Sequence, residues 1–336
     1  MPHYLLLVQP GRPRPRDAEC EFRTRDALYV ATTHLSRSTR GERTDVLEVH
    51  GTESLDFKYE VILPPKRAQA LNYRGLVRTN SNGQWVLVQN ATPATSITVV
   101  DLSQRKVLAE VSTPGCWGVL PAATHPMRFS MLCGDGKVAT VTLNEQGQVT
   151  ERQVSEKLFD PDEDAWFHHA EQLQDRYWFL SFKGVMTELD LGGPVAVKRQ
   201  AWRLVDPAAQ AKGWRPGGYQ NFAVHPDGKR AVLAMHSQGG EGSHKRPAQA
   251  LWTVDLTNGQ RLSSVPGRSV IALTFSRSGE RLHAIDGEKG GFRADVEIAL
   301  VMLVEIEHVG RNEVLPAMIF ERVSHVVPFS CRFSQC

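Results

Sequence analysis

The chain has 336 residues, of which 41% are hydrophobic and 23% are charged, and its formal net charge is +2. Because 39 basic residues stand against 37 acidic ones, we expect neither nucleic acid nor an anionic membrane surface as a partner. The longest apolar runs, such as residues 298–304, fall far short of the roughly 20 residues that a transmembrane helix needs. We therefore expect a globular protein with a substantial core and no membrane span.

The N-terminal segment 1–21 is atypical. Its apolar run, residues 4–8, lacks the basic start, the length and the cleavage site of a secretory signal peptide, so we predict no such signal. The cysteines are odd in number and none lies in a C-x-x-C pattern, which argues against a zinc ribbon or a redox motif. They are Cys20, Cys116, Cys133, Cys331 and Cys336.

A repeated pattern of strands runs through the middle of the chain. Short runs rich in β-branched and aromatic residues recur 44 to 58 residues apart, and several follow a turn that contains Gly83, Gly228 or Gly279. The runs begin near Ala27, Trp85, Phe129, Tyr177, Arg230 and Arg281.

Four further segments predict β-hairpins, since each reads as a strand, a tight turn and a returning strand. They begin at Ser96, Val138, Gly184 and Ala250. A unit of several strands repeated every 40 to 50 residues or so is the signature of a β-propeller, and about six units are visible. A β-sandwich would lack the long period, and a doubly wound α/β fold would need long helical patterns. We therefore predict an all-β propeller.

Two segments interrupt the repeat, and we expect both in loops between blades, where propellers commonly bind partners. The first, residues 154–172, is acidic, and the second, residues 202–221, contains a possible short helix at 207–212. No hairpin unit is recognisable in the C-terminal part. The predicted domains are an atypical N-terminal segment, the propeller, and an atypical C-terminal segment with an incomplete last blade, with bounds at 1–21, 22–287 and 288–336.

The first interrupting segment contains candidate metal ligands. Its acidic residues follow the spacing of an EF-hand loop, but Ala165 stands where the sharp turn needs glycine, so we prefer a solvated acidic loop. These residues are Asp160, Asp162, Asp164 and Glu171. The adjacent His168 and His169 would point to opposite faces of a strand and could not share one metal.

A second group of residues could in principle bind a metal or act as an acid and a base. His236, Glu241 and His244 could form a metal or acid–base cluster, but the glycines among them predict a flexible surface loop. The sequence has no G-x-S-x-G, H-E-x-x-H or phosphate-loop motif. We therefore predict no catalytic residue and no metal ligand in this chain, which favours a scaffold or a partner subunit over a self-contained enzyme.

Cys116 and Cys133 are the cysteine pair whose positions in the sequence favour a disulfide, because they bracket a predicted hairpin. Two arms of this length can bring the cysteines within the Cα separation of roughly 5.5 Å that a disulfide requires. A bridge would indicate an oxidising compartment. Two buried free thiols are the alternative.

Four long stretches of the repeat are distinctive, namely TPGCWGVLPAATHPMRFSMLCGDGKVATVTL, EKLFDPDEDAWFHHAE, GWRPGGYQNFAVHPDG and AMHSQGGEGSHKRPAQALWTVDL. In this order they closely resemble the heavy chain of the quinoprotein amine dehydrogenases, the methylamine and aromatic amine dehydrogenase family. Residues 31–49 and 63–102 resemble the same family and are nearer its aromatic (aralkylamine) branch. The resemblance covers the whole predicted propeller, residues 22–287.

The resemblance implies a seven-bladed β-propeller, here with incomplete N- and C-terminal blades, that pairs with a small disulfide-rich light chain in an α2β2 assembly. The cofactor, tryptophan tryptophylquinone, is made from two tryptophans of the light chain, which also supplies an aspartate as catalytic base. None of the tryptophans here is therefore expected to be a precursor. The implied reaction converts a primary amine to an aldehyde and ammonia, and the electrons pass to a blue copper protein, azurin or amicyanin, in the periplasm.

The resemblance also implies roles for individual residues. The family lines its substrate channel with an aromatic residue just before a Ser-Arg pair, and here Leu35 takes that place before Ser36 and Arg37. A leucine removes the ring from the channel wall, and a core leucine at a blade edge is the alternative. The family bridges the two cysteines that match Cys116 and Cys133.

Neither end of the chain resembles the family. We therefore expect the chain to lack an export signal and a complete seventh blade, and the state of the three cysteines in these segments stays open. They are Cys20, Cys331 and Cys336. Two other functions remain open: a non-catalytic propeller that binds another protein, and a propeller hydrolase with a central metal of its own.

Overall fold

The computed structural model describes residues 27–37, 39–52, 54–68 and 73–287. Several predictions lie outside these residues: those on the two atypical terminal segments, on the apolar run 298–304, and on Cys20, Cys331 and Cys336. Within the described ranges, no helix has the length and apolar character needed to cross a membrane.

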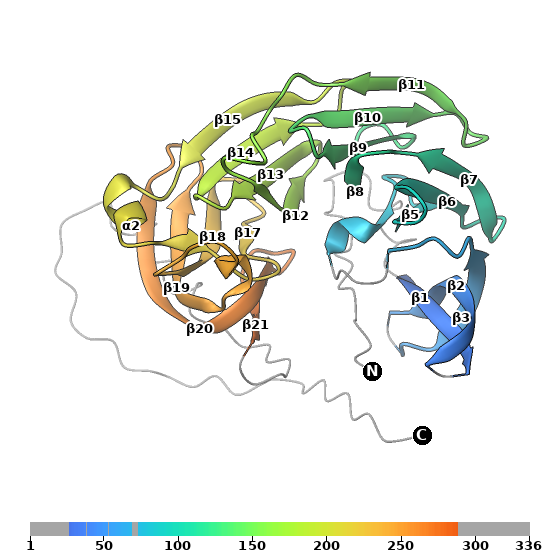
Figure 1. Cartoon of the computed structure of the whole chain (residues 1–336), viewed down its shortest axis with the longest axis horizontal. Helices are drawn as coiled ribbons and strands as arrows, with labels where there is room; N and C mark the ends of the chain where they lie inside the picture. The colour runs from blue at the N-terminus through green and yellow to red at the C-terminus, as the bar shows by residue number, and fades with distance from the viewer. Residues whose placement is uncertain (1–26, 38, 53, 69–72, 288–336) are drawn as a thin grey trace.

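The described chain folds into antiparallel sheets that follow one another around an arc, from β1–β3 at one end to β20 and β21 at the other (Figure 1). The first sheet has three strands: β1 (Ala27–Arg37), β2 (Arg40–Gly51) and β3 (Phe57–Leu63). The second contains β4 (Val77–Thr79), β5 (Trp85–Asn90), β6 (Ser96–Asp101) and β7 (Lys106–Ser112).

The third and fourth sheets repeat the four-stranded pattern. The third contains β8 (Cys116–Pro121), β9 (Arg128–Cys133), β10 (Val138–Leu143) and β11 (Val149–Val154). The fourth contains β12 (Trp166–Leu173), β13 (Arg176–Ser181), β14 (Val185–Asp190) and β15 (Val197–Arg203). Each strand pairs with its neighbour in sequence, which is the order of a propeller blade.

The fifth sheet joins two units through one long strand. Its members are β16 (Arg215–Pro216), β17 (Phe222–Val224), β18 (Arg230–His236), β19 (Ala248–Asp255), β20 (Arg261–Phe275) and β21 (Leu282–Asp286). Residues 261–266 of β20 pair with β19, whereas residues 272–275 pair with β21. Arg268 and Ser269, between these two stretches, have positive φ angles of 48° and 56°. The strand therefore ends one blade-like unit and begins the next.

The hydrophobic core lies between consecutive sheets. One cluster joins Leu47 and Val49 of the first sheet to Val86 and Val88 of the second. Equivalent clusters lie between the later sheets and include Phe129, Tyr177 and Trp252. Because both faces of an inner sheet are covered in this way, every residue of the middle strands β5, β6 and β10 is buried. Sheets packed face to face around an arc are the arrangement of a propeller.

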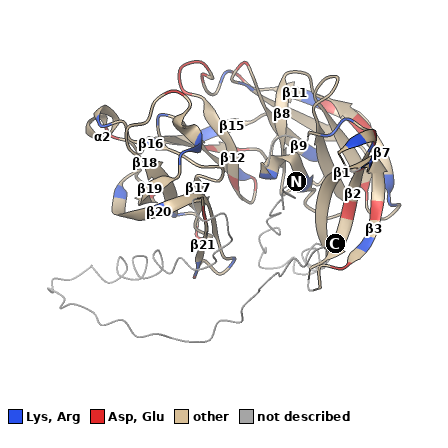
Figure 2. Cartoon of the chain, turned by 60° about the horizontal axis from the view of Figure 1, so that its bottom comes forward, with Lys and Arg blue, Asp and Glu red and all other residues tan. Residues whose placement is uncertain are grey.

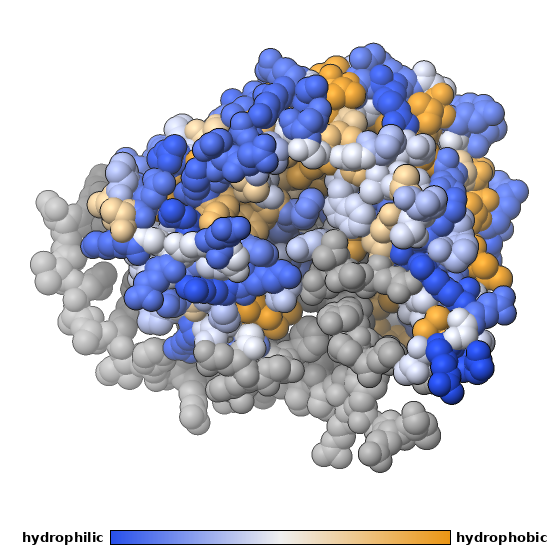
Figure 3. Space-filling model, in the orientation of Figure 1, coloured by the Kyte–Doolittle hydropathy of each residue, from blue (hydrophilic) through white to orange (hydrophobic). Residues whose placement is uncertain are grey.

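The outermost strands are charged. In β11 every residue is exposed except the partly buried Glu151, and Arg152 lies beside it. In β15 the exposed residues include Lys198 and Arg199. Charged side chains on an edge strand discourage pairing with another sheet. Basic and acidic residues are interspersed over β2, β3 and β7 (Figure 2), and the face in Figure 3 is largely hydrophilic with scattered hydrophobic residues. This distribution agrees with the small net charge.

Much of the predicted pattern is confirmed. Every predicted strand run and hairpin coincides with strands of the structure, and the turn glycines Gly83, Gly228 and Gly279 adopt φ angles of 69°, 73° and 79°. The predicted short helix is α2 (Pro207–Ala211), which Asp206 caps by accepting a hydrogen bond from the Ala209 N–H. The propeller class is thus supported, while seven as the number of blades stays a prediction.

Candidate functional site

The β1–β2 hairpin carries the predicted channel residue. Leu35 lies opposite Arg43 near the turn that joins β1 to β2, and the strand register shifts between Leu35 and Arg37. The Leu35 side chain is half-buried, and Ser36 and Arg37 beside it are exposed. Gly41 closes the turn with a φ angle of 102°, and a Cβ there would collide with the Ser36 hydroxyl. Glycine is therefore required to fold this tip, and Leu35 is partly accessible to solvent.

A buried carboxylate holds the two strands of the hairpin together close to this tip. Asp45 is fully buried, and the Arg43 guanidinium donates two hydrogen bonds to it, from Nε at 2.8 Å and from Nη2 at 2.5 Å. The Thr33 hydroxyl and the Arg67 N–H also donate to Asp45, at 2.7 and 3.1 Å. Burial by itself would raise the pKa of Asp45, but the hydrogen bonds from Arg43, Thr33 and the Arg67 N–H, together with the charge of Arg43, lower it below its usual value. The ionised carboxylate thus ties β1, β2 and the segment after β3 together.

A second buried ion pair links the innermost strands. Arg74 lies in the short helix η1 (Arg74–Leu76), which contacts β8 and β12, and its Nη1 donates to Glu171 Oε1 on β12 at 2.8 Å. His169 Nε2 lies 3.3 Å from the same oxygen and 2.8 Å from the Phe222 carbonyl oxygen on β17. The cluster therefore connects the segment before the second sheet with the inner strands of the fourth and fifth.

The cysteine bridge is confirmed. Cys116 and Cys133 face each other across β8 and β9 and form a disulfide with a Cα–Cα distance of 3.9 Å. It joins the inner strand of the third sheet to its neighbour, and the alternative of two free thiols is wrong.

The candidate ligands of the first interrupting segment do not converge on one point. Asp160 accepts the N–H groups of Asp162 and Glu163, while Asp164 accepts the Ser181 hydroxyl and the Lys183 N–H. Glu171 is the buried partner of Arg74 described above. The acidic residues thus stabilise turns and an ion pair. The expectation of a solvated loop is wrong for Glu171, which lies buried in the strand β12.

The histidine candidates are also separated. His168 is exposed beside the Tyr73 ring at a centroid distance of 5.5 Å, whereas His169 is buried, so the expectation of opposite faces is confirmed. His236 is buried on β18, where burial lowers its pKa, while Glu241 and His244 are exposed in or next to the short helix η2 (Ser243–Lys245). These three do not form a ligand group among the residues that the structure describes.

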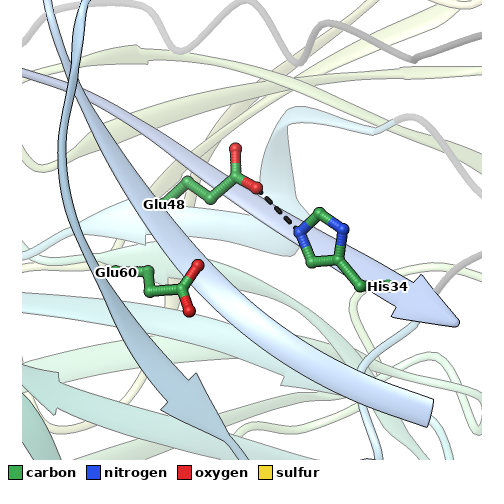
Figure 4. Close-up of side chains that lie close together, drawn as sticks. All are labelled: His34, Glu48 and Glu60. Atoms are coloured by element: carbon green, nitrogen blue, oxygen red, sulfur yellow. Dashed lines mark hydrogen bonds and ion pairs between the residues drawn. The ribbon is translucent and has the colours of Figure 1, made fainter. Parts of the chain in front are cut away.

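A different group of possible ligands comes together on the first sheet. His34 of β1, Glu48 of β2 and Glu60 of β3 each offer one ligand atom, and these atoms lie within 4.8 Å of one another (Figure 4). The sequence alone does not reveal this group, because only the register of three strands brings residues with these spacings together. No local motif signals it.

Comparison with known proteins explains the repeat. A family model described as methylamine dehydrogenase heavy chain (MADH) matches residues 23–291, which is most of the chain. The chain belongs to the methylamine dehydrogenase heavy chain family. A heavy chain of this name from Methylophilus methylotrophus is 24% identical over 297 residues, which cover 87% of this chain and 71% of that one.

Two further proteins are similar to the chain. The methylamine dehydrogenase heavy chain of Paracoccus versutus is 27% identical over 256 residues, or 75% of this chain and 59% of that one. Among solved structures, the β-propeller domain of Cps50 (Swd1) from Myceliophteria thermophila aligns with a TM-score of 0.44 and 14% identity over 63% of this chain and 62% of that one. The chain thus spans less than two thirds of the Paracoccus heavy chain. Membership of the aromatic branch stays a prediction.

Proposed function

We propose that the chain is the heavy subunit of a periplasmic amine dehydrogenase that oxidises primary amines to aldehyde and ammonia and passes the electrons to a blue copper protein, azurin or amicyanin. The single observation that carries the proposal is the family match over residues 23–291. In the proposed α2β2 assembly, a light chain carries tryptophan tryptophylquinone and the catalytic base. Aromatic amines are the proposed substrates, because residues 31–49 and 63–102 are nearer the aromatic branch.

The tryptophans of this chain do not fit the quinone cofactor. Trp214 and Trp252 form the one tryptophan pair in ring contact among the described residues, with a centroid distance of 5.2 Å. Trp252 is only 1% exposed within the hydrophobic core, and the Arg261 guanidinium lies 4.4 Å from its ring centroid. The Trp252 ring is therefore shielded from solvent, while its neighbour Trp214 is half-buried. The environment of these rings therefore supports a cofactor on another chain.

In this proposal the chain docks the light chain and shapes the path of the amine. Leu35 forms part of the channel wall, because its half-buried side chain lies near the exposed end of a hairpin that Asp45 holds in place. A leucine leaves more room there than an aromatic ring. The channel should therefore admit amines that are bulkier than methylamine.

The substitution Leu35→Phe tests this role in the assembled enzyme. The added ring narrows the channel, so we expect kcat/KM for 2-phenylethylamine to fall by roughly tenfold relative to kcat/KM for methylamine. Leu262→Phe is the control, since Leu262 is an exposed leucine on β20 in another sheet. If both variants leave the ratio of the two amines unchanged, Leu35 does not line the channel.

The docking role is tested by expressing the chain together with an amine dehydrogenase light chain. We expect a stable complex in which the light chain copurifies with this chain in equal amounts. Failure to form a complex would favour the alternative of a non-catalytic propeller scaffold.

A further inference from the structure

The first sheet has one face against the core and one face away from it. Leu47 and Val49 of β2 pack into the core cluster that the first sheet shares with the second. Successive side chains of a strand point to opposite faces, so Glu48, between them, projects from the other face. Glu60 lies directly opposite Glu48 in the β2–β3 register and therefore shares that face. His34 of β1 reaches the same point, with its Nε2 atom 2.9 Å from Glu48 Oε1 (Figure 4).

Two carboxylates directly opposite each other on neighbouring strands repel, and such a pair weakens a sheet. Here the ligand oxygens of Glu48 and Glu60 lie within 4.8 Å of each other and of the His34 nitrogen. A cation placed between these atoms would remove the repulsion and bond to all three strands. The three donors come from three different strands, so one ion would link β1, β2 and β3.

A fourth side chain orients the cluster. His50 Nε2 lies 3.0 Å from the second oxygen of Glu48, Oε2, and His50 Nδ1 lies 3.2 Å from the Leu55 carbonyl oxygen. The Phe57 ring packs edge-on against the His50 ring at a centroid distance of 5.8 Å. His50 thus holds the carboxylate of Glu48 with one oxygen facing His34. Metal sites commonly orient their ligands through such outer contacts.

We propose that His34, Glu48 and Glu60 form a binding site for one Zn²⁺ ion that cross-links the three strands of the first sheet. A mixed set of one imidazole nitrogen and two carboxylate oxygens suits zinc, whereas calcium and magnesium prefer oxygen ligands alone. The Glu48 side chain is 20% exposed and that of His34 is 58% exposed, so the ion can enter directly from solvent. The site belongs to the scaffold and does not depend on the proposed enzyme activity.

The test is Zn²⁺ binding to the purified full chain, measured by equilibrium dialysis with metal analysis. We expect one equivalent of zinc per chain, and His34→Ala and Glu60→Gln should each weaken the affinity by at least about tenfold. Zinc should also raise the Tm of the wild type but not that of His34→Ala, since only the former gains a ligand specific to the folded state. Both side chains are exposed, so the variants should fold, and circular dichroism verifies this.

Two matched variants serve as controls. Glu42→Gln removes an exposed carboxylate at the start of the same strand β2, and His244→Ala removes an exposed imidazole in η2. Both should bind zinc as the wild type does. The proposal is overturned if the wild type binds no zinc, if His34→Ala and Glu60→Gln bind it unchanged, or if His244→Ala is the variant that loses it. It is equally overturned if millimolar Ca²⁺ displaces the zinc, since that would reveal a simple carboxylate cluster.

Discussion

The buried ion pair between Arg74 and Glu171 gives the sharpest prediction about stability. The side chains are 5% and 1% exposed, and the Nη1–Oε1 distance is 2.8 Å. Glu171→Gln keeps the shape of the side chain but removes its charge, so the buried guanidinium loses its ionic partner. Removing one member of a buried pair costs about 3–5 kcal/mol, which corresponds to a fall in Tm of roughly 6–20 °C for a domain of this size.

The control is a pair with the same geometry at the surface. Lys66 Nζ and Glu110 Oε2 lie 2.9 Å apart, but their side chains are 35% and 34% exposed. Glu110→Gln should therefore cost less than about 1 kcal/mol. Urea denaturation followed by circular dichroism compares the two variants with the wild type.

The double variant Arg74→Met/Glu171→Met should lose less stability than Glu171→Gln, because no buried charge is then left without its partner. If Glu171→Gln is as stable as Glu110→Gln, burial does not set the contribution of this pair, and the reasoning fails.

Two further predictions concern the same framework. Replacing both Cys116 and Cys133 by alanine should lower the free energy of unfolding by about 3 kcal/mol, because the bridge closes a loop with a sequence separation of 17 residues; equal urea midpoints for the variant and the oxidised wild type would contradict this. Asp45→Asn should destabilise the protein most at pH 7. Since folding lowers the pKa of Asp45, its stabilisation is present above about pH 4 and is lost as the pH falls through the folded value, so the gap between variant and wild type should shrink at pH 3. A gap that is the same at both pH values would refute the prediction.

Local features of the fold were predictable from the sequence. The turn glycines Gly228 and Gly279 precede the strands β18 and β21, and their positive φ angles confirm the turns. Strand-forming runs and the turn residues between them are signals that extend over only a few residues. Hairpins such as β6–β7 and β10–β11 could therefore be placed without knowledge of the tertiary structure. The disulfide also follows a single hairpin, formed by β8 and β9.

Contacts between distant segments were not predictable in the same way. Arg74 and Glu171 are 97 residues apart, and they meet only because η1 packs against the inner strands of later sheets. The group of His34, Glu48 and Glu60 depends on the register of β1, β2 and β3, and neither the spacing of these residues nor their type gives a recognisable motif. The short inner strands, such as β4 and β17, were missed because three residues carry too little pattern.

The proposed role as the heavy subunit of an amine dehydrogenase can be measured as the amine-dependent reduction of azurin. The reaction is followed by the absorbance of the copper centre of azurin, with the copurified complex of this chain and a quinone-bearing light chain. We expect rapid reduction by the complex on addition of 2-phenylethylamine, and none by this chain alone. A complex that forms and carries the quinone but reduces no copper protein with any primary amine would contradict it.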